Sequence, residues 1–228
     1  MDISIFNVLG PIMIGPSSSH TAGAAKLSKA ARAIVGKPFS RVSFGLHGSF
    51  AKTYKGHGTD VALVAGALGL KENDDRLEKA FELADKAGLA YDFYEIELEN
   101  MHENTVVMTF YLENGEKTEI IGASIGGGEI LIKRIDGFDT ELRMNSSTLL
   151  ICQEDKVGII SEISRVLAKH QINIGVMTVN RSSKGGTAYC TIETDSYLTD
   201  EVVEALRKVP KIISVKAINV VMEDDEHV

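Results

Sequence analysis

The last third of the chain carries an order of elements that leaves few folds open. From Thr148 onward, short apolar runs typical of strands alternate with two segments of helical periodicity, and a Lys-Gly-Gly turn separates two of the strands. The six segments are a strand at 148–153, a helix at 157–171, strands at 173–183 and 187–195, a helix at 199–209 and a strand at 212–222. This βαββαβ order predicts a ferredoxin-like domain over 148–222, followed by an acidic tail at 223–228.

Residues 1–135 predict a second domain of α+β class, with a mixed arrangement of helices and an antiparallel sheet. The expected helices cover 22–35, 59–69 and 74–88, and the expected strands cover 41–47, 94–99, 105–126 and 128–135. Within the long strand segment, Asn114-Gly115 is a strong hairpin signal. Residues 136–147 show no sustained periodicity and are predicted to be the linker between the two domains.

Composition excludes several classes of partner. The formal charge of −8 and a pI near 5.3 argue against binding to a nucleic-acid backbone, which needs clustered cations. No segment approaches the roughly 20 apolar residues of a membrane span, and the first residues lack the basic start of a signal peptide, so we expect a cytoplasmic protein without a membrane partner. Cys152 and Cys190 lie in apolar strand-like runs and are predicted to be core thiols; two cysteines cannot supply the usual ligands of an iron–sulfur cluster.

The segment "GPSSSHTAG" at residues 15–23 gathers hydroxyl groups directly before a predicted helix. Unpaired N–H groups and the positive end of the helix dipole favour an anion there, so the hydroxyls of Ser17, Ser18, Ser19 and Thr21 are candidates to hold a substrate carboxylate. The alternative is that one hydroxyl caps the helix and the others face water. A cap needs one oxygen and the segment offers four, which favours the ligand site.

Two histidines stand at two predicted helix starts. His20 lies in the first segment, and His57 lies in "GHGTD", where Gly58 allows tight geometry and Thr59 is the expected cap of a helix that continues with Asp60. An imidazole is a suitable base for abstracting a proton, and the nearby helix N-terminus lowers its basicity and keeps it neutral. For His47 a structural role at a strand end is preferred.

Metal and hydrolase chemistry find little support. His20, His57 and His102 do not follow the HxxxH or HxH spacing that would place two ligands on one face, so no metal site is predicted. No GxSxG segment is present for a serine nucleophile. The segment "GASIGGGE" at 122–129 lacks the lysine of a phosphate loop and the spacing of a dinucleotide fingerprint, so its glycines predict close approach of backbone.

The segment "EDKVGIISEISRVLAKHQINIGVMTVNR" at 154–181, within the βαββαβ order, resembles the ACT domain, a small regulatory module that binds amino acids at edges shared between copies. The resemblance implies a regulatory amino-acid site at Gly158, Asn173 and Ile174, and self-association through this domain. The alternative is that Asp155 caps the helix, Gly158 serves packing and the domain only dimerises.

The segments "GPSSSHTAG", "GSFAKTYKGHGTDVAL" and "GASIGGGEI" together resemble the β chains of iron–sulfur-dependent L-serine dehydratases, also called L-serine ammonia-lyases. The resemblance spans nearly the whole chain, and the first domain also resembles the allosteric substrate-binding domain of some phosphoglycerate dehydrogenases. It implies a lyase of amino-acid metabolism that turns L-serine into pyruvate and ammonia. The [4Fe-4S] cluster of this enzyme would be held by a partner α subunit and would act as a Lewis acid on the β-hydroxyl. The resemblance implies no pyridoxal phosphate.

The same resemblance implies roles for individual residues. His20 and His57 are implied as catalytic base or proton shuttle. The residues implied to bind substrate are Ser17, Ser18, Ser19, Thr21, Gly58, Thr59, Asp60 and Asn104. Thr59 and Asp60 would also orient His57. Where related chains carry "HPNT", this chain has "HENT", so Glu103 replaces a proline, which predicts a less rigid loop and leaves the role of His102 open. The rival hypothesis is a non-enzymatic amino-acid-sensing regulatory subunit in which the same loops bind serine.

Overall fold

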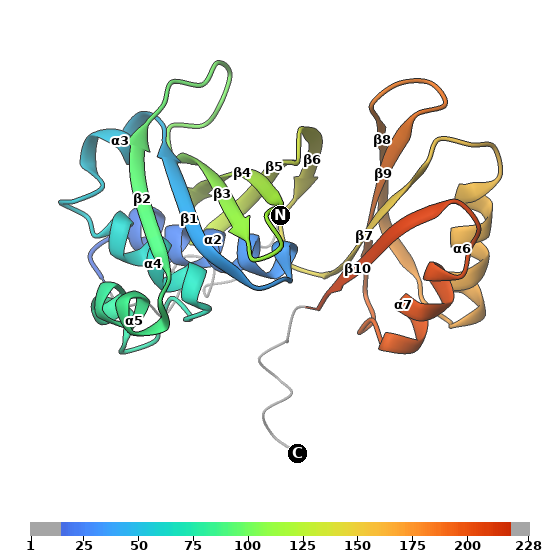
Figure 1. Cartoon of the computed structure of the whole chain (residues 1–228), viewed down its shortest axis with the longest axis horizontal. Helices are drawn as coiled ribbons and strands as arrows, with labels where there is room; N and C mark the ends of the chain where they lie inside the picture. The colour runs from blue at the N-terminus through green and yellow to red at the C-terminus, as the bar shows by residue number, and fades with distance from the viewer. Residues whose placement is uncertain (1–14, 220–228) are drawn as a thin grey trace, which may run out of the picture. The chain divides into compact units, whose positions relative to one another are not determined.

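The computed structural model describes residues 15–219, which form two units (Figure 1). The first unit runs to Gly137 and includes Glu141–Arg143, and the second contains Phe138–Thr140 and the chain from Met144. Both units combine helices and sheets, which confirms the predicted α+β class. The predicted acidic tail at 223–228 lies outside the described residues.

The helices of the first unit follow the three predicted helical segments, with two additions, η1 and α3. They are the π-helix η1 (Ser18–Ala22), α2 (Gly23–Val35), α3 (Gly48–Thr53), α4 (Thr59–Leu68), the 3₁₀ helix η2 (Leu77–Lys79) and α5 (Ala80–Ala87). The C-terminus of α2 is capped by Gly36 in the left-handed region, whose N–H donates to the Arg32 carbonyl. The unpredicted α3 has only six residues, too few to show helical periodicity in the sequence.

The first unit holds the sheet of order β2-β1-β3-β4-β5-β6. Its strands are β1 (Phe39–Leu46), β2 (Ala90–Glu95), β3 (Thr105–Leu112), β4 (Lys117–Gly126), β5 (Glu129–Ile135) and β6 (Phe138–Leu142). The expected hairpin joins β3 to β4 through Gly115 at φ +83°. The prediction of a wholly antiparallel sheet is wrong at one edge, where β1 and β2 pair in parallel because the helical crossover between them returns the chain in the same direction.

The predicted linker at 136–147 is not irregular throughout. Its middle forms β6, and its last residue, Ser147, begins the next strand. Along β6 the buried side chains of Thr140 and Leu142 alternate with the exposed Asp139 and Glu141. This period-two pattern is only five residues long and mixes polar with apolar residues, so it was not visible as a strand signal.

Helices α2 and α4 pack unusually closely on each other, and α2 also packs against β3, β4 and β5 (Figure 1). The contact is made at Gly66, where a Cβ atom would lie 2.3 Å from the Ala25 carbonyl oxygen and 2.7 Å from the Ser28 Cβ. Because only glycine leaves this space, the two helix axes approach more closely than side chains normally allow. The pairing fixes the two helices that follow the histidine-bearing loops.

The second unit has the predicted βαββαβ order. Its elements are β7 (Ser147–Glu154), α6 (Ile159–Lys169), β8 (Ile174–Arg181), β9 (Thr187–Thr194), α7 (Asp200–Arg207) and β10 (Ile212–Ile218). The sheet has the order β10-β7-β9-β8 with every pairing antiparallel, as the ferredoxin-like arrangement requires. Apolar side chains of β7 and β9 pack against α6 and α7 to form the core, including Leu149, Ile163, Leu167, Ile192 and Leu206.

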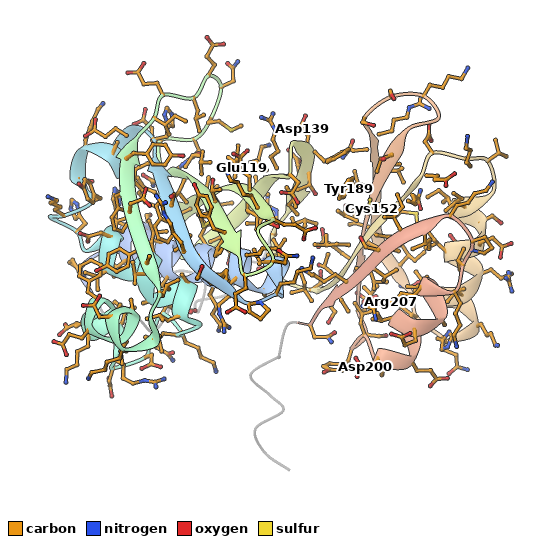
Figure 2. All side chains as sticks on the ribbon, in the orientation of Figure 1. Glu119, Asp139, Cys152, Tyr189, Asp200 and Arg207 are labelled. Atoms are coloured by element: carbon orange, nitrogen blue, oxygen red, sulfur yellow. The ribbon has the colours of Figure 1, made fainter. Side chains whose placement is uncertain are left out.

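The two cysteines lie on adjacent strands but on opposite faces of this sheet. Cys190 is opposite Ile151 and packs in the core under the helices, whereas Cys152 is opposite Tyr189 and shares a hydrogen bond with it (Figure 2). The ring centroids of Phe138 and Tyr189 lie 3.9 Å apart, so Phe138 packs on the face of the sheet that carries Cys152 and Tyr189. Both thiols are free and buried, as predicted, and burial raises the pKa of Cys190 to about 12.

Candidate functional site

The serine-rich loop enters α2 through the π-helix η1. Such single-turn π-helices are rare and are frequent at functional sites. Ser17 caps the turn, since its Oγ accepts a hydrogen bond of 3.1 Å from the backbone N–H of His20. Gly15 has φ +115°, and a Cβ there would lie 2.5 Å from Cγ2 of Thr21, so a glycine is required. The loop therefore has one defined conformation, with Ser17 engaged in capping.

The second loop reaches α4 through a different cap from the predicted one. Gly58, at φ +65°, is the N-cap residue, and Thr59 is already inside the helix with its N–H donated to the Tyr54 carbonyl. The prediction that the Thr59 side chain caps α4 is wrong, because Gly58 turns the chain directly into the helix. Asp60 accepts a hydrogen bond from the N–H of Val61, and among residues 15–219 neither Thr59 nor Asp60 hydrogen-bonds to His57.

The two loops meet and bring the two predicted histidines together. The hydroxyl of Thr21 donates a hydrogen bond of 2.9 Å to the backbone carbonyl of His57. The ring centroids of His20 and His57 lie 4.9 Å apart with the ring planes inclined by 42°. Thr21 is buried, and its hydrogen bond to His57 holds the two loops together. The two imidazoles therefore form a pair at the starts of two helices.

His20 is the more enclosed imidazole of the pair. Its Nε2 lies 3.1 Å from Oγ of Ser49, and the edge of the Phe50 ring lies against it with centroids 5.3 Å apart. Burial, and to a lesser degree the nearby His57, lower the pKa of His20 below its usual value of 6.5. His20 is therefore mainly neutral at pH 7, and the cause is burial and the neighbouring imidazole.

Ser49 is a site residue that the sequence did not single out. It belongs to the predicted segment "GSFAKTYKGHGTDVAL", but its partner His20 lies 29 residues earlier and no local pattern links them. The local sequence offered one indication of a constrained backbone at Ser49, namely Gly48 directly before it. Gly48 has φ +58°, which sets the entry into α3 and points to a constrained backbone there.

A third loop, "HENT", supports this arrangement at the first turn of α3. The carbonyl of Glu103 accepts hydrogen bonds from the N–H groups of Ser49 at 2.8 Å and Phe50 at 3.4 Å. The Nδ1 of His102 accepts a bond of 3.1 Å from the N–H of Asn104, so His102 stabilises its own loop. Asn104 is buried, and its Oδ1 has no hydrogen-bond partner among residues 15–219, which leaves this acceptor for a ligand.

The glycine-rich third motif contains one glycine in close contact and two that shape a turn. A Cβ at Gly122 would lie 2.7 Å from Cδ1 of Leu27 in α2, which confirms the predicted close approach at this position. Gly126 and Gly127 have positive φ, and a Cβ at either position would meet nothing within 4 Å, so they shape the turn from β4 to β5. Ser124 is fully buried, and a Cβ at Gly23 would lie 2.0 Å from its Oγ, which places β4 directly against the start of α2.

A groove of about 490 Å³ opens beside His57. Its lining comes from α3, the loop after it and β2, and consists of Ala51, Lys52, Thr53, Tyr54, Lys55, Gly56, His57 and Glu95. His57 is exposed, whereas Ser18 and Ser19 are half-buried, and the hydroxyls of both serines have no hydrogen-bond partner among residues 15–219. The groove thus combines a free imidazole with two lysines able to attract an anion.

Comparison with known proteins agrees with these motifs. A family model described as serine dehydratase beta chain matches residues 4–88. The chain is 43% identical to the probable L-serine dehydratase, beta chain, of Bacillus subtilis (strain 168), over 94% of this chain and 97% of the relative. It is also 43% identical to the L-serine dehydratase, beta chain, of Peptoniphilus asaccharolyticus, over 96% of this chain and 99% of the relative.

The chain belongs to the serine dehydratase β chain family. This confirms the family resemblance of the three loop motifs.

In this β chain, a family model described as ACT domain matches residues 147–211. The second unit is also similar to the ACT domain from GTP pyrophosphokinase of Chlorobium tepidum, with 27% identity and a TM-score of 0.28 over 32% of this chain and 95% of that structure. The family match confirms the predicted ACT domain.

The predicted regulatory residues of the ACT domain lie at two strand–helix junctions of its sheet. Gly158 is the N-cap of α6 at φ +94°, and nothing lies within 4 Å of a Cβ position, so the turn is open to a ligand. Asn173, just before β8, donates a hydrogen bond of 3.1 Å to Asp195, and Ile174 begins the strand. Asp155 does not cap α6 but accepts bonds from the Gly185 N–H and the Arg181 side chain.

The described part of the β chain does not supply a metal or cluster site of its own. Within residues 15–219 no three side chains of His, Cys, Asp or Glu come together to hold a metal ion. Cys152 and Cys190 lie on opposite faces of their sheet, and burial raises the pKa of both thiols, which disfavours the thiolate that iron requires.

The helices within residues 15–219 are all too short or too polar to cross a membrane.

Proposed function

We propose that this chain is the β subunit of an L-serine dehydratase, which converts L-serine into pyruvate and ammonia together with an α subunit. The observation that carries the proposal is the pairing of His20 and His57, 4.9 Å apart at the starts of two helices beside an open groove. Membership of the serine dehydratase β chain family supports it. Because the chain has only two cysteines and both are buried, the cluster would belong to the α subunit, where it would supply a Lewis acid.

His57 is the proposed base. The reaction removes the poorly acidic α-proton of serine and its β-hydroxyl, and the resulting enamine yields pyruvate and ammonia on tautomerisation and hydrolysis. His57 is exposed and lines the groove, and its side chain makes no hydrogen bond within residues 15–219. Its imidazole is therefore free to accept the proton.

His20 is the proposed proton shuttle behind His57. Burial keeps His20 neutral at pH 7, so its ring is able to accept a proton from its neighbour. The nearby His57 also contributes to the lowered pKa of His20, since two imidazolium groups at this distance would repel each other. The pair would thus carry one proton at a time, which suits release of that proton toward solvent.

The substrate's polar groups have proposed partners on the loop that carries His20 and on the loop that supports α3. The free hydroxyls of Ser18 and Ser19, at the start of η1, would bind the carboxylate where the helix dipole is favourable. The unpartnered Oδ1 of Asn104 would accept from the substrate amine. Ser17 and Thr21, which were also predicted to bind substrate, are engaged in hydrogen bonds that hold the loops, and their proposed role is to keep the site in shape.

The test is anaerobic pyruvate formation from L-serine by this chain alone and mixed with an iron–sulfur α subunit. We expect activity only in the mixture, with a loss of roughly 10²-fold or more in His57→Ala, since general base catalysis contributes about that much. His20→Ala should also lose activity while the complex still forms on gel filtration. His170→Ala, which changes a histidine at the end of α6 in the ACT domain, is the matched control.

A different outcome would favour the rival function. If the mixture formed pyruvate and both His20→Ala and His57→Ala kept near-normal rates, the loops would be a regulatory binding site of an amino-acid-sensing subunit. Amino-acid binding at Gly158, Asn173 and Ile174, self-association through the ACT domain and a cytoplasmic location stay predictions. Calorimetric titration of L-serine into the chain, with and without Gly158→Val, tests the first of these.

A further inference from the structure

The hydrogen bond between Ser49 and His20 joins two segments that the sequence places far apart. Oγ of Ser49 lies 3.1 Å from Nε2 of His20, and Ser49 stands in the first turn of α3. We propose that Ser49 is a positioning residue, which fixes the ring orientation and tautomer of His20, and that the backbone carbonyl of Glu103 in turn holds Ser49 in place. The catalytic consequence of this pairing rests on the function proposed above.

The first turn of α3 is held by backbone atoms on every side. The N–H groups of Ser49 and Phe50 both converge on the Glu103 carbonyl, which satisfies two donors that a helix start leaves unpaired. A Cβ at Gly48 would lie 2.7 Å from the Glu103 carbonyl oxygen and 2.9 Å from its Cα. The hydroxyl of Thr53 donates to the Ser49 carbonyl from the other end of the helix. Ser49 therefore has little freedom to move away from His20.

The direction of the hydrogen bond depends on the tautomer of His20. If Nε2–H of His20 donates to Ser49, Nδ1 of the ring keeps its lone pair and the half-buried serine hydroxyl donates to solvent. If the Ser49 hydroxyl donates to Nε2, the neutral ring carries its own proton on Nδ1. The Phe50 ring also packs against the imidazole, with centroids 5.3 Å apart. In both cases Ser49 holds Nε2 in a hydrogen bond and thereby fixes one ring orientation and one tautomer of His20.

The same contacts explain what residue 103 contributes. The side chain of Glu103 is exposed, and only its carbonyl takes part in holding α3. A proline at this position retains that carbonyl and lacks only an N–H that donates to no described backbone acceptor. Glu103→Pro and Glu103→Ala should therefore leave His20 unchanged, whereas Gly48→Ala should disturb it.

The test reads the histidine ring directly. In the full chain labelled with ¹⁵N-histidine, wild type should show His20 in one dominant neutral tautomer with a hydrogen-bonded Nε2. Ser49→Ala should shift the tautomer populations, Ser49→Thr should restore them, and Glu103→Pro should match wild type. In the mixture with the α subunit, Ser49→Ala should lower kcat by roughly tenfold with little change in KM, as expected for loss of one ordinary hydrogen bond.

The outcomes separate the two proposals. Unchanged His20 nitrogen shifts in a folded Ser49→Ala variant would overturn the positioning role, whatever the activity. Altered shifts together with a wild-type mixture that forms no pyruvate would support the positioning role and contradict the proposed lyase function. Altered shifts with an unchanged kcat and pH profile would overturn the catalytic part of the inference. Circular dichroism of each variant shows that the chain has folded.

Discussion

Gly66→Ala should destabilise the first unit and displace both histidines. The new Cβ would lie 2.3 Å from the Ala25 carbonyl oxygen and 2.8 Å from the Lys29 nitrogen, which are backbone atoms of α2. A backbone in the middle of a helix cannot give way as a flexible side chain can, so α4 must move away from α2. Because η1 and the His57 loop lead directly into these two helices, that movement would separate the rings of His20 and His57.

The magnitude follows from two opposing contributions. Overpacking of a close contact costs roughly 1–3 kcal/mol. Alanine is better than glycine in a helix by about 1 kcal/mol, and it also lowers the entropy of the unfolded chain. The expected net loss is up to about 2 kcal/mol in the free energy of unfolding, or a fall of up to roughly 8 °C in Tm.

Gly56→Ala is the matched control. Gly56 has no positive φ, and the nearest atom to its Cβ position is the Thr53 carbonyl oxygen at 3.7 Å, an ordinary contact. The gain from the unfolded chain is the same in both variants, so their difference is the cost of the close contact at Gly66 less the helix-propensity gain of alanine in α4. Urea unfolding followed by circular dichroism, with anaerobic lyase assays in parallel, measures both effects. If Gly66→Ala proved as stable and as active as Gly56→Ala, the inferred rigidity of the α2–α4 contact would be refuted.

Three further predictions concern single groups. Burial lowers the pKa of His20 in the folded chain, so the unfolded chain binds a proton at this residue more readily. The contribution of neutral His20 to the free energy of unfolding is therefore complete above about pH 6.5 and is lost as the pH falls. In urea titrations, wild type should lose more stability than His20→Asn between pH 7.5 and pH 5. Neither Cys152 nor Cys190 should react with a disulfide reagent at pH 8 until denaturant is added; rapid labelling of either thiol would contradict its burial. Thr59→Val should keep or raise Tm, since the Thr59 hydroxyl is buried without a partner among residues 15–219, and a clear fall in Tm would show a missed hydrogen bond.

The ACT domain was the most predictable part of the chain. Its strands and helices are separated by turn residues, and each shows the period of its own element, so the order βαββαβ could be read directly. The first unit was harder, because the parallel pairing of β1 with β2 depends on where three helices place the returning strand. The π-helical conformation of Ser18–Ala22 depends on the contact of Gly15 with Thr21 and on the cap at Ser17, which no propensity encodes.

The candidate site was predictable in its residue types but not in its connections. His20 and His57 were identified from their glycine- and hydroxyl-rich surroundings and from the family resemblance, and the structure brings their rings together. Ser49 was missed because its contact with His20 crosses 29 residues. The hydrogen bonds from α3 to the Glu103 carbonyl could not be predicted for a different reason. Every residue has a backbone carbonyl, so the residue type at position 103 does not indicate this contact.

Three buried polar atoms next to the loops have no hydrogen-bond partner among residues 15–219: the Thr59 hydroxyl, the Asn104 carbonyl oxygen of the side chain and the Ser124 hydroxyl. Each such group costs roughly 1–3 kcal/mol when left unsatisfied, and apolar replacements of the same shape would avoid that cost. Thr59 starts the helix after His57, Asn104 follows the carbonyl that holds α3, and Ser124 touches the start of α2 at Gly23. Their gathering where the loops converge is what a site that completes its hydrogen bonds with substrate would require.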